Sequence, residues 1–142
     1  MSQINWSRVV TGGAVWFVSY NLLTGLAWLA FLHRWGLPSF HPLLGAPQTP
    51  STGRILGVLL LTLAMGIFAM WLYAAIRPRY GARPITSAYA AVGLWLVWGL
   101  FPSFDSFTSL IAGSLLLELV CKLGVLIAAT AAGASLYNET AV

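Results

Sequence analysis

The feature that most constrains this chain is an apolar stretch at residues 106–137 that contains only two charged side chains, Glu118 and Lys122. A helix of about 20 apolar residues is enough to cross the hydrocarbon core of a bilayer. A charge near the bilayer centre costs about 3 kcal/mol on insertion scales, so such side chains face a bundle interior or a cavity and find a partner. Glu precedes Lys by four residues, which is the favourable order on one helix face. The stretch therefore predicts a membrane helix with a mutually neutralising pair near the bilayer midplane.

The composition extends this prediction to the whole chain. Of its 142 residues, 59% are hydrophobic and 7% are charged, which leaves too little polar surface to solvate a globular domain. Four spanning segments with short connections account for this length. We therefore expect an all-α fold: one integral membrane domain, residues 1–142, built as a bundle of four transmembrane helices at about 9–32, 54–76, 85–101 and 106–137.

The distribution of arginines predicts the orientation. Four crossings put both termini on one side, and the basic residues divide four against two between the sides: Arg8, Arg77, Arg79 and Arg83 on the terminal side, Arg34 and Arg54 on the other. Cytoplasmic loops carry the excess of Lys and Arg. Both termini are therefore expected in the cytoplasm, in a multi-pass protein of the inner (plasma) membrane. This also accounts for the net charge of +4 without a nucleic-acid partner.

The connection at residues 77–84 is expected to be a tight turn between two helices. Gly81 suits a helix end, and Pro84 suits the first position of the next helix. Its arginines, Arg77, Arg79 and Arg83, also suit anionic lipid head groups, although the topology signal explains them equally well and is preferred.

Polar residues inside the apolar segments are the candidate site. Ser114 precedes Glu118 by four residues, so Ser114, Glu118 and Lys122 form one polar stripe on a helix. Asn21 lies within the first segment, where its amide needs a hydrogen-bond partner. It either joins two helices, with Glu118 as one candidate partner, or bonds to its own backbone.

Small residues predict where helices approach closely. They recur in the second and fourth segments at spacings typical of helix packing: Gly57, Ala64, Gly66 and Ala69, then Gly113, Gly124, Ala128, Ala132 and Gly133.

The residues that support catalysis or metal binding are scarce. His33 and His41 lie in a connection at 33–53, but the chain has no further His, and its one cysteine, Cys121, lies in the last apolar segment. Three acids, two His and one Cys give little material for acid–base chemistry. We expect no metal site, no cofactor and no enzymatic activity.

Three short stretches carry a resemblance. They are the sequence WLYAAIRPRYG at 71–81, the Thr-Ser-Ala start of the third segment, and the Gly-Ala-Ser-Leu-Tyr-Asn-Glu end of the fourth. Together they resemble small uncharacterised four-helix inner-membrane proteins of bacteria. The resemblance implies a four-helix topology and a bacterial source, and it brings no activity, ligand or site residue.

Two classes of function remain. The preferred one is a non-catalytic module that lies in the lipid bilayer and packs with a second copy of itself or with a larger membrane complex; the polar stripe then serves helix packing. The alternative is a small proton- or cation-coupled transporter or channel in which Glu118 binds the cargo ion. A water-accessible cavity at Glu118 would favour the alternative.

Overall fold

The computed structural model describes residues 4–32, 51–100 and 112–137, which form four helices and contain no strand. Helix α1 spans Trp6–Ala27 and continues as a π-helical turn, η1, at Trp28–Leu32. Helix α2 spans Thr52–Tyr80, and α3 spans Pro84–Trp95 and continues as a second π-helical turn, η3, at Leu96–Leu100. Helix α5 spans Ala112–Ser135. The predicted all-α class is confirmed.

Three of the helices are long and apolar enough to cross a membrane: Trp6–Ala30, Thr52–Tyr80 and Leu116–Ser135. The chain is therefore a helical membrane protein. The apolar helix Pro84–Trp98 is shorter. At a rise of 1.5 Å per residue it extends about 22 Å, against about 30 Å for a typical hydrocarbon core.

The helix boundaries correct one sequence prediction. Residues 77–84 were expected to form a turn, but α2 continues through Pro78 to Tyr80. Proline removes one backbone hydrogen bond, and it does so here in the last turn of a long helix, where little helix remains to be disrupted. Gly81, with φ 80°, ends the helix, and its N–H donates to the Arg77 carbonyl at 2.8 Å. Pro84 is the first residue of α3, as predicted.

Polar caps explain why two helices begin earlier than hydropathy suggests. Asn5 and Ser51 precede α1 and α2, and each side chain accepts a hydrogen bond from the backbone N–H three residues later, at 3.3 Å in both cases. Such caps satisfy N–H groups that have no partner within the helix. The connection expected at 33–53 therefore ends at Ser51. Its remaining residues and the predicted start of the fourth helix at 106 lie outside the described residues.

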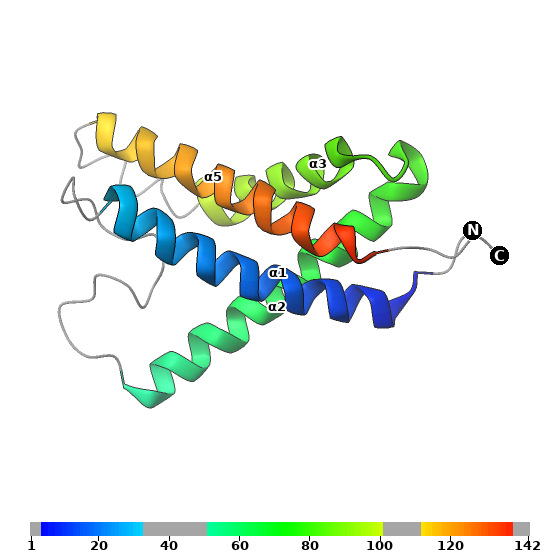
Figure 1. Ribbon diagram of the computed structural model, residues 1–142, viewed down its shortest axis with the longest axis horizontal. Helices are drawn as coiled ribbons and strands as arrows, with labels where there is room; N and C mark the ends of the chain where they lie inside the picture. The colour runs from blue at the N-terminus through cyan, green and yellow to red at the C-terminus, as the bar shows by residue number, and fades with distance from the viewer. Residues whose placement is uncertain (1–3, 33–50, 101–111, 138–142) are drawn as a thin grey trace.

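The four helices pack together as one bundle. Helix α1 contacts α2 and α5, and α3 contacts α5 and α2. The start of α1, the turn between α2 and α3, and the end of α5 all lie at one end of the molecule (Figure 1). The first half of α2 diverges from α1 and α5 (Figure 1), and many of its side chains are exposed.

Four glycines let α1 cross α2 and α5 at close range. A Cβ atom on Gly13 of α1 would lie 2.8 Å from the Ile67 Cα of α2, and one on Gly133 of α5 would lie 2.8 Å from the Gly12 carbonyl oxygen. Gly66 of α2 likewise faces the Gly13 carbonyl. We call Gly12, Gly13, Gly66 and Gly133 the glycine crossing. The sequence pattern found its members in α2 and α5 and missed the two in α1.

Candidate functional site

Helix α5 has one face buried inside the bundle and an opposite face that is exposed. Lys122 is only 7% exposed and lies on the same buried face as Leu126 and Thr130. Leu116 and Val120 lie on the opposite face and are 66% and 60% exposed. A lysine on the inner face of a membrane helix is the most unusual feature of the described residues, since charged side chains are seldom buried unless they are paired.

Glu118 is half-buried at the edge of the face that carries Lys122. The two side chains attract each other electrostatically across one helical turn. Within the described part of the chain no nitrogen–oxygen distance of 4.0 Å or less joins them as a direct ion pair. The lysine is thus the interior member of the pair, and the glutamate is its neighbour at the margin of the bundle.

The surroundings of Lys122 on the α1 side follow from the register of the two helices. The Trp16 indole N–H donates to the Thr130 hydroxyl oxygen at 3.0 Å. Gly12, four residues before Trp16 in α1, meets Gly133, three residues after Thr130 in α5. Because α1 and α5 run antiparallel, stepping eight residues along each helix from Trp16 and Thr130 brings Thr24 level with Lys122. Thr24 is fully buried.

The aromatic rings of Trp16 and Tyr20 lie along α1 between the levels of Thr130 and Thr24. Trp16 and Tyr20 stack with ring centroids 4.8 Å apart and planes at 6°. Tyr20 in turn lies against Thr24 and Trp98. We call Thr130, Trp16, Tyr20, Thr24 and Lys122 the polar ladder, because they follow one another along the α1–α5 contact. Stacking and buried hydrogen bonds fix the register of the two helices.

Helix α3 is attached to α5 at the level of the charged pair. The Trp95 indole N–H donates to the Leu119 carbonyl oxygen at 3.1 Å. Leu119 follows Glu118 directly in α5, so this bond holds α3 beside the pair. The sequence does not indicate the roles of Trp16, Thr130 and Trp95, because tryptophan in a membrane helix is typical of the interface with the head groups as well.

Asn21 and Ser114 complete the predicted polar set. The Asn21 side-chain amide donates to the Phe17 carbonyl at 2.8 Å within α1. A role of Asn21 in joining two helices stays a prediction. Ser114 belongs to α5, but its side chain lies outside the described residues, as do His33, His41 and Arg34. The extension of the stripe to Ser114 stays a prediction.

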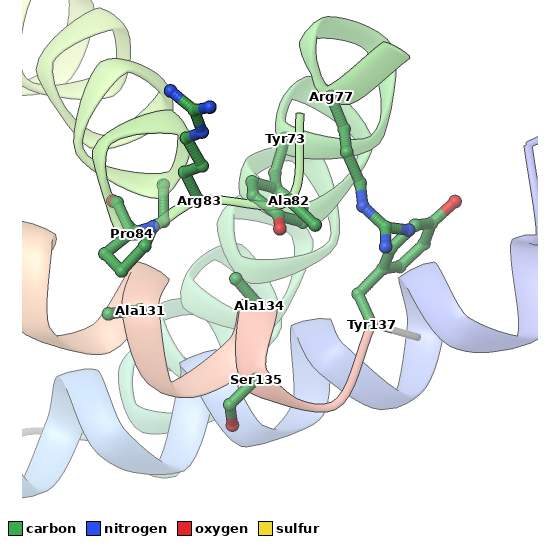
Figure 2. A pocket seen from close by; sticks show the side chains of 10 residues that line it. Tyr73, Arg77, Ala82, Arg83, Pro84, Ala131, Ala134, Ser135 and Tyr137 are labelled. Carbon is green, nitrogen blue, oxygen red and sulfur yellow. The ribbon is translucent and has the colours of Figure 1, made fainter. Parts of the chain in front are cut away.

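The described residues also contain a cavity of about 280 Å³ at the end of the molecule where α2, α3 and α5 meet. Figure 2 shows the Arg77 guanidinium lying across the Tyr137 ring, at 5.3 Å from its centroid. Tyr73 meets the same ring edge-on, with centroids 5.9 Å apart. The lining consists of Tyr73, Arg77, Ala82, Arg83, Pro84, Ser87, Ala131, Ala134, Ser135 and Tyr137.

The three arginines predicted as lipid contacts are therefore not equivalent. Arg77 and Arg83 line the cavity, whereas Arg79 is exposed and does not. Neither Glu118 nor Lys122 is among the lining residues. The charged pair and the cavity are separate sites in opposite halves of α5.

Comparison with known proteins does not assign the chain to a family. No protein-family model, no curated protein and no solved structure matches the chain. The resemblance to small bacterial inner-membrane proteins stays a prediction.

Proposed function

We propose that this protein is a non-catalytic integral membrane module whose buried polar ladder and glycine crossing hold its helices in one arrangement for assembly with a second copy or with a larger membrane complex. The observation that carries the proposal is the position of Lys122, buried on the inner face of α5 beside Glu118. Hydrogen bonds from Trp16 and Trp95 attach the neighbouring helices on either side of it.

Packing is a sufficient role for these groups. A buried charge is costly by itself, and a nearby opposite charge reduces that cost without any cargo. A buried polar group also penalises alternative registers, because a shifted helix would leave it without its partners. Glu118 and Lys122 would thus select one arrangement of α5 against α1 and α3.

The arginines support four crossings with both termini in the cytoplasm of a bacterial cell. Arg77 and Arg79 lie in the last turn of α2, Arg83 precedes α3, and the Arg8 guanidinium donates to the Leu136 carbonyl at 3.5 Å. These residues therefore gather at one end of the molecule, as the positive-inside rule requires of a cytoplasmic side. The short α3 would cross if the bilayer thins locally or if its flanks reach the interface.

The alternative, proton- or cation-coupled transport through Glu118, makes a different demand on the same residue. A transport carboxylate needs water access from each side in turn, and its proton or cation must leave during the cycle. The half-buried position of Glu118 is compatible with such access, and this keeps the alternative open to experiment.

The experiment compares the purified protein with Glu118→Gln, an amide of nearly the same shape that cannot exchange a proton. Thermal stability is measured in detergent, and proton and cation flux is measured in proteoliposomes under a pH or salt gradient. The packing proposal expects a loss of stability in the variant and equal flux in protein-containing and empty liposomes. Flux that the wild type supports and Glu118→Gln abolishes, with stability unchanged, would replace this proposal by transport. Leu116→Ala, on the exposed face of the same helix, is the control.

A further inference from the structure

Helix packing does not explain the cavity where α2, α3 and α5 meet. Its volume is about 280 Å³, well above the roughly 10–15 Å³ that a cavity needs to hold one water molecule. Among the described residues, two arginines line it and no Asp or Glu does. The acidic residue of α5, Glu118, lies 17 residues before Ser135, about 25 Å away along the helix. The cavity is therefore a cationic site without an acidic side chain in its described wall.

One of the arginines is held in place by the packing of the cavity wall. Arg77 is half-buried, and its guanidinium carbon lies over the Tyr137 ring, 5.3 Å from the ring centroid. Tyr137 is only 2% exposed and is fixed in turn by the edge-on contact with Tyr73. A guanidinium is planar and presents its N–H donors in a rigid fork that can bind two phosphate oxygens at once. Arg77 is thus oriented before any ligand arrives.

The other groups around the cavity favour an anion as well. Arg83 is the residue before α3, makes no side-chain cap for that helix, lines the cavity and is exposed. The first turn of α3 adds the partial positive charge of a helix N-terminus. The hydroxyls of Ser87 and Ser135 donate to carbonyls of their own helices, each at 2.7 Å. The guanidinium groups therefore supply the strong hydrogen-bond donors.

The position of the cavity indicates which anion reaches it. It lies at the ends of the apolar helices, where head groups meet the protein, and part of its wall is apolar: Pro84, Ala131 and Ala134. Nearby, Tyr80 and Tyr89 are exposed and meet edge-on with centroids 5.5 Å apart. Exposed tyrosines of membrane proteins gather at the depth of the head groups. We propose that this cavity binds the phosphate group of an anionic phospholipid through Arg77 and Arg83.

The test uses the full-length protein, purified in detergent and stripped of lipid, with phosphatidylglycerol as the probe. Binding is measured by native mass spectrometry and by the shift in melting temperature. Arg77→Gln and Arg83→Gln are each expected to weaken phosphatidylglycerol binding by about tenfold or more, since each removes charge-assisted hydrogen bonds to phosphate. Arg79→Gln is the matched control. It removes the same charge only two residues from Arg77, but Arg79 does not line the cavity, so we expect phosphatidylglycerol binding to change by less than about twofold.

Several outcomes would overturn the proposal. An equal loss in all three variants would mean that only the general positive charge of this end attracts lipid. Binding of phosphatidylcholine as tight as that of phosphatidylglycerol would exclude a site selective for anionic lipid. Inorganic phosphate that competes at equal concentration would identify the free ion as the ligand.

Arg83→Gln remains informative if Arg77→Gln fails to fold, because Arg83 is exposed and its loss leaves the contact of Arg77 with Tyr137 in place. The result is also independent of the packing proposal, since neither Glu118 nor Lys122 lines the cavity.

Discussion

The indole N–H of Trp16 donates to the hydroxyl of Thr130 over 3.0 Å in the buried interior, and the two residues are 114 positions apart in the chain. This bond joins the first described helix to the last. It also sets the register that brings Thr24 level with Lys122, so it links the packing of α1 to the burial of the charge on α5.

The first prediction concerns this bond. Thr130→Val removes the acceptor and leaves the buried indole N–H without it, so we expect a loss of about 1–3 kcal/mol in the free energy of unfolding. Trp16→Phe combined with Thr130→Val should cost less than the sum of the two single changes, because neither group is then left unsatisfied. Denaturation in mixed detergent micelles measures all three. Strictly additive losses would mean that the bond does not contribute.

The second prediction concerns the glycine crossing. Gly13→Ala places a methyl group 2.8 Å from the Cα of Ile67, and a backbone atom cannot move aside as a flexible side chain can. We expect a loss of about 1–3 kcal/mol in the free energy of unfolding. Gly124→Ala in α5 is the control, because a Cβ there has nothing within 4 Å. Equal stability of the two variants would contradict the close crossing.

The third prediction concerns orientation. Single cysteines at Ser51, which caps α2, and at Ala82, just beyond its other end, are introduced in a Cys121→Ala background. A membrane-impermeant thiol reagent added outside intact cells should label position 51 and spare position 82, because the arginine-rich end is expected in the cytoplasm. The opposite labelling would reverse the topology.

The fourth prediction concerns the arginines that set this orientation. Arg79→Glu together with Arg83→Glu replaces two positive charges of the predicted cytoplasmic side with negative ones. We expect a lower amount of protein in the membrane or a mixed orientation, measured by the same labelling at Ala82. Normal amount and orientation in this variant would mean that Arg79 and Arg83 do not set the topology.

Hydropathy predicted the all-α membrane class and the approximate positions of the helices, because segment length in a bilayer is a property of each segment alone. Which helices touch is a property of pairs of segments, and here the sequence was less informative. The spacing pattern indicated Gly57 and Gly124 as sites of close helix contact, just as it indicated Gly66 and Gly133. However, a Cβ atom at Gly57 or Gly124 would meet nothing within 4 Å.

The polar contacts show the same limit. The sequence offered Asn21 as a residue that joins helices and did not offer Trp16, whose indole N–H donates to Thr130 of another helix. Both side chains suit either role, and only the three-dimensional neighbours decide between them. Likewise the sequence predicted a turn from residue 77, but α2 continues through Pro78 and ends at Gly81, because a proline in the last turn costs the helix little.

The central claim, that Glu118 and Lys122 compensate each other inside the bundle, is tested most directly by a double-mutant cycle of unfolding free energy with Glu118→Gln, Lys122→Met and their combination. Each single change leaves one charge without its counterpart, and because Glu118 is only half-buried we expect losses of about 1–3 kcal/mol. The double variant should be more stable than the sum of the single losses by at least about 0.5 kcal/mol. Lys122→Met combined with Thr62→Val, in α2, is the additive control. Additive losses in the Glu118–Lys122 cycle, as in the control, would contradict the account.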